Sequence, residues 1–147
     1  MSRYGVSSNQ VNLEITESAA SYNQSVMSEN LERLSAAGLT FSLDDYGTGY
    51  SNMYRIAALP LKIVKLDKTF VNNQNSKMWT ILQNTVRMIK ELNMEIVVEG
   101  IETEEMVKKF SDLKCDFIQG YFFSKPIPQR EFVEFIDRWN NRQKVNA

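Results

Sequence analysis

The stretch Leu39-Thr40-Phe41-Ser42-Leu43-Asp44-Asp45-Tyr46-Gly47-Thr48-Gly49-Tyr50-Ser51 has the pattern of a short strand followed by a glycine-containing loop. Apolar and polar side chains alternate over residues 39–44, which is typical of a strand with one buried face. Two aspartates end this strand, and the paired glycines after them allow a tight turn and a close backbone approach to a ligand. Because glycines after strands often only turn the chain, the loop by itself is a weak indication of function.

Four more extended runs flank this strand, at residues 11–15, 61–66, 95–99 and 116–119. The stretches between and after them carry apolar residues at helical intervals: Met27, Leu31 and Leu34; Trp79, Leu82, Val86 and Ile89; Met106, Phe110 and Leu113; Phe132, Phe135, Ile136 and Trp139. A further short helix is expected between Ser51 and Pro60. Strands that alternate with helices at this spacing form βα units, so we predict one α/β domain of about five units with parallel strands.

Each predicted strand has a charged or amide side chain at or near its carboxyl end: Glu14, Asp44, Lys65, Glu99 and Gln119. One polar residue in such a place commonly just faces water. Five with the same alternation favour a binding site, because ligands of parallel α/β folds bind beyond the carboxyl ends of the strands.

Four carboxylates at this end would repel one another unless a cation lay among them. They are Glu14, Asp44, Asp45 and Glu99. Oxygen ligands favour Mg²⁺ or Mn²⁺ over zinc, and the adjacent aspartates could reach two different ions. Lys65 could orient an anion or a water molecule, or could simply neutralise the cluster.

Composition excludes several other kinds of chemistry. The 147 residues include 17 basic and 18 acidic side chains and no histidine, and the net charge is −1. Histidine-dependent nucleophile systems and histidine zinc sites are therefore excluded, and a nucleic-acid polymer or an anionic membrane is not expected as a partner. The single Cys115 cannot form an internal disulfide. No signal peptide or membrane span is evident, so we expect a cytoplasmic protein.

Five blocks of the sequence resemble the signature motifs of EAL-type cyclic di-GMP phosphodiesterases. They are residues 13–18, 44–51, 65–71, 98–103 and 119–126. They follow the family's order, and the resemblance extends from about residue 3 to residue 136. It implies part of a (β/α)8 TIM-like barrel and the hydrolysis of cyclic di-GMP to linear pGpG, in bacterial second-messenger signalling, with two Mg²⁺ or Mn²⁺ ions.

The resemblance also implies roles for individual residues. Glu14 would bind the first metal, Asp44 would bridge both metals, and Asp45 and Glu99 would bind the second. Glu99 is also the candidate base, Lys65 would hold the attacking water or a phosphate oxygen, and Gln119 would support water or substrate. Glu17 would brace the loop formed by Tyr46, Gly47, Thr48 and Gly49, and Glu102 would partner Glu99. Tyr46 stands where the family more often has phenylalanine.

The resemblance covers only part of the family's domain. A full (β/α)8 barrel needs about 250 residues, and neither the family's Glu-Ala-Leu segment nor an early asparagine ligand has a counterpart here. We therefore expect residues 1–147 to be the C-terminal part of one EAL domain, with an incomplete first metal site and no activity on their own. The exposed strand edges predict self-association into a homo-oligomer.

The sequence is compatible with three interpretations. The parent protein is an active phosphodiesterase, or it is a non-catalytic module that binds cyclic di-GMP or serves as a scaffold, or the 147 residues are an inert structural piece. A sensor or a GGDEF domain is a further expected partner in the parent protein.

Overall fold

The computed structural model describes residues 2–21, 24–49, 53–72 and 75–145. Within them, one sheet contains five strands, and every neighbouring pair is parallel. The strands lie side by side in chain order: β1 (Asn12–Thr16), β2 (Thr40–Tyr46), β3 (Ile63–Leu66), β4 (Glu95–Val98) and β5 (Phe117–Ile118). The predicted α/β fold with five parallel strands is confirmed.

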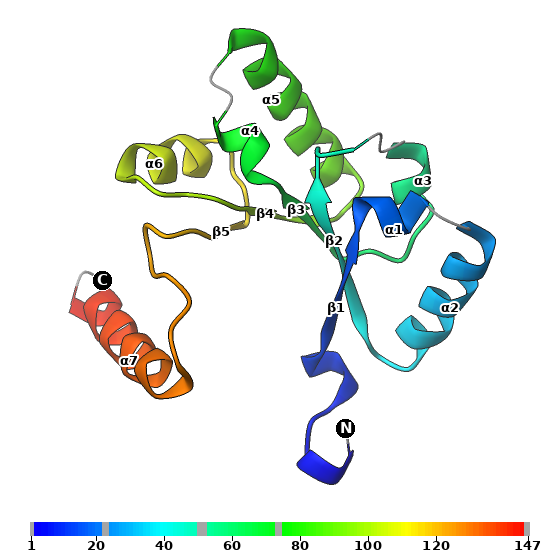
Figure 1. Ribbon diagram of the computed structural model, residues 1–147, viewed down its shortest axis with the longest axis horizontal. Helices are drawn as coiled ribbons and strands as arrows, with labels where there is room; N and C mark the ends of the chain where they lie inside the picture. The colour runs from blue at the N-terminus through cyan, green and yellow to red at the C-terminus, as the bar shows by residue number, and fades with distance from the viewer. Residues whose placement is uncertain (1, 22–23, 50–52, 73–74, 146–147) are drawn as a thin grey trace.

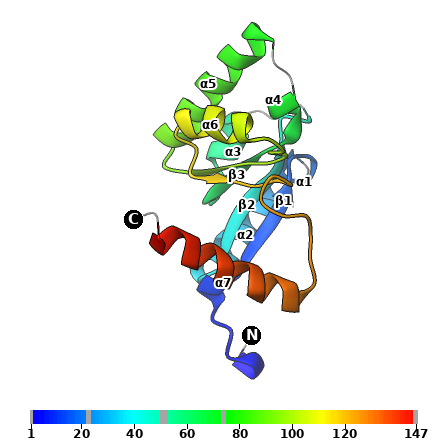
Figure 2. The ribbon, with the colours of Figure 1, turned by 90° about the vertical axis from the view of Figure 1, so that its left-hand side faces the viewer.

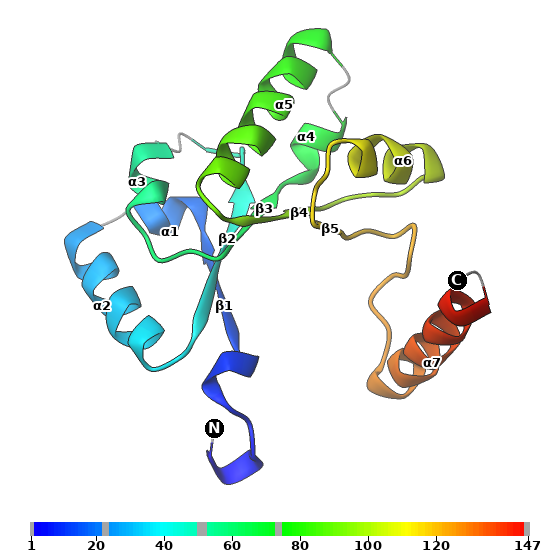
Figure 3. The ribbon, with the colours of Figure 1, turned by 180° about the vertical axis from the view of Figure 1, so that it is seen from behind.

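The helices follow the strands in alternation. They are α1 (Glu17–Ser21), α2 (Gln24–Ala36), α3 (Met53–Ala57), α4 (Lys68–Asn72), α5 (Ser76–Glu91), α6 (Glu104–Asp112) and α7 (Gln129–Val145), and two short 3₁₀ helices, Ser2–Tyr4 and Ser8–Gln10, precede β1. Figures 1 and 3 show α2, α3, α5 and α6 along one side of the curved sheet, whereas α7 lies apart from them at the end of a long connection from β5. The predicted helix between Ser51 and Pro60 is α3; Tyr50 and Ser51 themselves lie outside the described residues.

The hydrophobic core lies between the sheet and these covering helices. Alternate side chains of the three central strands supply one half of it, and Leu43, Val64, Leu66, Ile96 and Val98 are all fully buried. The other half comes from the apolar stripes of α5 and α6, which place Leu82, Ile89 and Phe110 against the strands. Because the same alternation turns the polar residues to the other side of the sheet, this packing fixes where the strand-end carboxylates point.

The two edges of the sheet are covered less well. Leu13 of β1 is exposed although Ile15, two residues further along the strand, is buried, and β1 has a neighbouring strand on one side only. At the other edge, Phe117 of β5 and Phe132 of α7 are both about half exposed, at 52% and 50%. Figure 2 shows α7 crossing in front of the strands as a separate element rather than packing between other helices. The sheet is thus an open arc, as a partial barrel requires.

Among the described residues, no helix is long and apolar enough to cross a membrane.

Candidate functional site

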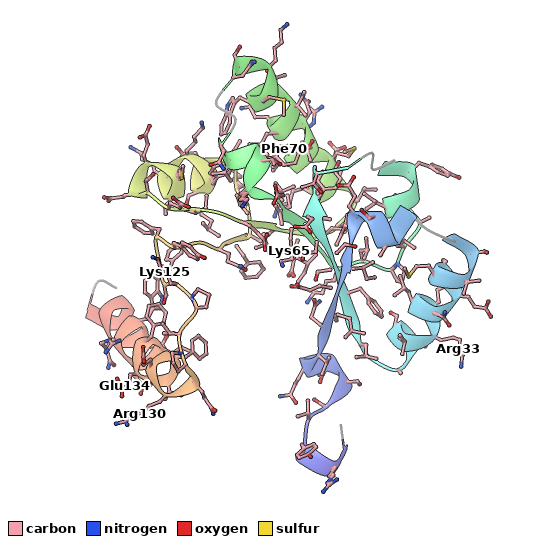
Figure 4. All side chains as sticks on the ribbon, viewed as in Figure 1. Arg33, Lys65, Phe70, Lys125, Arg130 and Glu134 are labelled. Atoms are coloured by element: carbon pink, nitrogen blue, oxygen red, sulfur yellow. The ribbon has the colours of Figure 1, made fainter. Side chains whose placement is uncertain are left out.

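The charged side chains predicted at the strand ends do converge on one place. Glu14 comes from β1, Asp44 from β2 and Lys65 from β3, and Glu99 directly follows β4. Parallel strands have their carboxyl ends at the same end of the sheet, and the alternation of side chains puts these residues on the same face. Figure 4 shows Lys65 near the middle of the sheet, so the carboxylates of its neighbours can reach it from both sides.

The ammonium group of Lys65 is the centre of this cluster. Its Nζ lies 2.9 Å from Oε1 of Glu14, 2.8 Å from Oδ1 of Asp44 and 2.9 Å from Oε1 of Glu99. The side chain is only 11% exposed. Burial alone would lower the pKa of Lys65, but the hydrogen bonds to the three carboxylates outweigh that effect and raise the pKa above its ordinary value. Lys65 is therefore positively charged throughout the physiological pH range.

A second group of carboxylates forms beside this ion-pair network. Asp44, Asp45 and Glu99 each offer an oxygen, and these three oxygens lie within 4.8 Å of one another. Oxygen atoms at such spacing, with a net negative charge, suit a hard divalent cation such as Mg²⁺ or Mn²⁺. Glu14 is not in this group, and its side chain is 52% exposed.

Adjacent residues of a regular strand point to opposite faces, so Asp44 and Asp45 would normally diverge. The pairing of β2 with β3 shifts register between Leu43 and Tyr46, and Asp45 has a φ of 57°, in the left-handed region. An irregularity of this kind turns the strand locally and re-aims its side chains. It explains how two consecutive aspartates contribute to one cluster.

Glu17 fixes the loop after β2. Its carboxylate is buried and accepts hydrogen bonds from the backbone N–H groups of Gly47, at 2.9 Å, and Gly49, at 3.1 Å. Gly47 has a φ of 105°, and a Cβ there would lie 2.0 Å from the ring of Phe70, so only glycine fits. Thr48 closes the turn by donating its hydroxyl to the carbonyl of Asp45 at 2.9 Å. The structure thus places Glu17 where the sequence predicted a loop brace.

The ring of Tyr46 stacks on Phe70 at a centroid distance of 6.1 Å. Burial, and secondarily the charge of Glu17, raise the pKa of the Tyr46 phenol, which stays neutral. Tyr46 therefore packs against α4 at the start of the loop.

A cavity of about 330 Å³ opens next to Glu99. Gln119 and Glu102, both predicted as site residues, line it together with residues for which the sequence indicated no role: Asp67, Lys68 and Tyr121. The backbone of Gln119 is held by hydrogen bonds to Val98 and Ile101. All the predicted site residues therefore lie around one end of the sheet. Lys68 and Tyr121 occur within the blocks that resemble the family's motifs, but only the fold shows that they face the cavity.

Comparison with known proteins places this arrangement in a family. The sequence model of the EAL domain matches residues 1–126. The chain belongs to the EAL domain family. Cyclic di-GMP phosphodiesterase NbdA of Pseudomonas aeruginosa is 36% identical over 126 residues, which are 84% of this chain and 16% of NbdA. The chain thus spans about a sixth of that relative's length.

Solved structures of EAL proteins have the same fold. The PaMucR phosphodiesterase in complex with c-di-GMP superposes with a TM-score of 0.83 at 34% identity, over 88% of this chain and 53% of that chain. Klebsiella pneumoniae BlrP1, solved with manganese and cyclic di-GMP, gives a TM-score of 0.78 at 27% identity, over 84% of this chain and 32% of that chain. The partial barrel of this chain is therefore part of the EAL architecture.

Proposed function

We propose that this chain contributes the second-metal side of a phosphodiesterase site that hydrolyses cyclic di-GMP to linear pGpG. The observation that carries the proposal is the cluster of Asp44, Asp45 and Glu99 at the carboxyl end of an EAL-family sheet, where Lys65 pairs with Asp44 and Glu99. The similar BlrP1 structure, a complex with manganese and cyclic di-GMP, supports both the metal and the substrate.

Mg²⁺ or Mn²⁺ would be held by Asp45 and Glu99 on one side and by Glu14 on the other, with Asp44 shared between two ions. Such ions polarise a phosphoryl oxygen and lower the pKa of a bound water molecule. Cooperation of two ions of this kind is common in phosphodiester hydrolysis.

The protein's own groups would do the remaining work. Glu99 would accept the proton of the attacking water, and its position beside both the cluster and the cavity supports this role. Lys65 would donate to that water or to a phosphate oxygen in exchange for one of its carboxylate partners, and Gln119 would support water or substrate from the cavity wall. Glu17 would steady the loop that follows Asp44 and Asp45, and Glu102 would position Glu99.

A second candidate function is a module that binds cyclic di-GMP without hydrolysing it. The exposure of Glu14 and its position outside the carboxylate triple favour this candidate for the 147 residues alone, because the first metal would have few ligands among the described residues. We therefore propose that the chain alone binds a divalent ion but turns over cyclic di-GMP poorly.

We also propose that the chain self-associates through the open side of its sheet. Its accessible surface is 10,321 Å², whereas a compact monomer of 17.0 kDa exposes about 7,700 Å². The excess of about 2,600 Å² is comparable to what a large permanent interface covers. A second copy that pairs its own β1 with β5 would cover both sheet edges at once. Sedimentation should show a dimer, and a monodisperse monomer would contradict the proposal.

A cytoplasmic signalling protein with a sensor or GGDEF domain is the proposed setting, which is supported by the similarity to the oxygen sensor protein DosP and to MucR, a bifunctional diguanylate cyclase and cyclic di-GMP phosphodiesterase.

The test of function is the conversion of cyclic di-GMP to pGpG with Mn²⁺, by this chain and by the chain fused behind the N-terminal half of an EAL domain. We expect clear turnover by the fusion and weak turnover by the chain. Glu99→Gln in the fusion should abolish hydrolysis while sparing binding. Binding without hydrolysis by the unaltered fusion would instead establish the non-catalytic module.

A further inference from the structure

Lys65 has contacts that account for all of its hydrogen-bonding capacity. An ammonium group has three N–H donors, and three carboxylate oxygens lie within 2.9 Å of Nζ. The partners come from three different segments of the chain, because Glu14 is in β1, Asp44 is in β2 and Glu99 follows β4. One buried side chain of β3 therefore ties together the carboxyl ends of four strands.

Without a positive charge at this point, the carboxylates would face one another across a poorly hydrated space. Like charges this close repel strongly, and the repulsion is least screened where water is excluded. Asp44 and Glu99 are both largely covered, at 22% and 19% side-chain exposure. Their close approach therefore depends on a cation, and in this arrangement the cation is the Lys65 ammonium.

We propose that Lys65 is a resident counter-cation, which holds the acidic cluster together in the metal-free protein and competes with the divalent ion for the same carboxylates. This inference rests on the proposed function only for the nature of the competing ion. Lys65 contacts Oδ1 of Asp44 and Oε1 of Glu99. The second oxygens of both groups, with Asp45, are left for the metal. The ion then binds a preformed site, but next to a fixed positive charge that weakens its affinity.

Removing a lysine that acted only on water or phosphate would have different effects. Its loss would lower turnover, but it would change neither the stability of the metal-free protein nor the affinity for the ion. As a counter-cation, Lys65 affects both quantities, and in opposite directions. Removing it destabilises the metal-free protein and tightens metal binding.

The test compares Lys65→Met, which keeps the length of the side chain and removes its charge, with the matched control Lys62→Met. Lys62 lies just before the same strand and forms an exposed ion pair with Glu95 at 3.9 Å, which contributes little. The Tm of each variant is measured in EDTA and in saturating Mn²⁺, and the Mn²⁺ affinity is measured by calorimetry.

For Lys65→Met we expect a metal-free Tm lower by about 4 °C or more, a Mn²⁺ Kd at least about tenfold tighter, and recovery of the lost stability in Mn²⁺. Lys62→Met should match the wild type in all three measurements. Lys65→Arg, which keeps the charge, should keep most of the metal-free stability. A Lys65→Met protein that stays unfolded even in Mn²⁺ would overturn the inference, because the ion should replace the ammonium.

The outcomes separate this inference from the proposed function. Equal Mn²⁺ affinity of wild type and Lys65→Met, or an unchanged metal-free Tm, overturns the counter-cation role alone. Failure of every protein, wild type included, to bind Mn²⁺ overturns the metal-dependent function as well.

Discussion

The central strands and the segment from β5 to α7 are both rich in apolar side chains, yet they are buried to very different degrees. Leu43, Val64 and Ile96 of the central strands are fully buried, whereas Phe117 and Phe132 of the second region are about half exposed. The central strands have neighbours on both sides and helices over one face, while β5 has a strand on one side only. Apolar composition therefore does not determine burial; the number of covering elements does. The well-packed region also supplies Asp44, Lys65 and Glu99, because a rigid sheet holds charged groups at fixed distances.

The largest expected effect comes from removing one apolar side chain in each region. Leu43→Ala should lower the free energy of unfolding by about 2–5 kcal/mol, because it leaves a cavity in the core. Phe132→Ala should cost about 1 kcal/mol or less, since half of its side chain is already in water. Urea denaturation of both variants measures the difference. Equal losses would show that α7 is covered in solution.

Removing the Glu17 carboxylate, which braces the loop after β2, should have the next largest effect on the free energy of unfolding. Glu17→Ala should cost about 2 kcal/mol, because the backbone N–H groups of Gly47 and Gly49 lose a charged acceptor. Hydrogen exchange of these two amides should become faster. Glu29→Ala, at an exposed position of α2, is the control and should change stability by less than about 0.5 kcal/mol. Unchanged exchange at Gly47 and Gly49 in the Glu17 variant would contradict the bracing contact.

Asp116 connects the weakly covered edge to the packed region. It lies just before β5, accepts a hydrogen bond from the N–H of Ile96 at 2.7 Å, and pairs with Lys90 of α5. Burial acts to raise the pKa of Asp116, but the bonds from Lys90 and Ile96 outweigh it and lower the pKa below its ordinary value of 3.8. A lowered pKa stabilises the folded state above that value, and the contribution is lost as the pH falls through the folded pKa.

We therefore expect Asp116→Asn to cost about 1 kcal/mol at pH 7. The difference from wild type should hold down to about pH 5 and shrink below about pH 4. Urea denaturation between those values measures it, with Asp112→Asn, at an exposed position of α6, as the control. A difference that does not depend on pH would mean that the charge of Asp116 is not involved.

The sequence predicted the strands, their parallel pairing and the polar face of the sheet, because these depend on local alternation and on the order of the elements. It predicted that Asp44 and Asp45 belong to one cluster, but not how adjacent residues reach it, since that depends on the irregular pairing of β2 with β3. The contact between Gly47 and Phe70 is likewise tertiary and leaves no local signal. Lys65 was expected near the acids, but the simultaneous contact with three of them follows from the register of four strands.

The sequence predicted exposed strand edges, because five strands cannot close a barrel, but it did not show which apolar side chains would be exposed. Leu13 and the apolar side of α7 have the same alternation or helical spacing as buried segments, and only the position of each element in the sheet decides what covers it.

The most direct test of the carboxylate cluster as a divalent-cation site is a Mn²⁺ titration of the wild type and of Asp44→Asn, followed by calorimetry. Asp44 forms an ion pair with Lys65 and also belongs to the carboxylate cluster with Asp45 and Glu99. It is therefore part of both the ion-pair network and the proposed metal site. We predict saturable binding of about one ion per wild-type chain, and at least about tenfold weaker binding by Asp44→Asn. Equal binding by the two proteins would show that the ion, if held at all, lies elsewhere, and would contradict the proposed site.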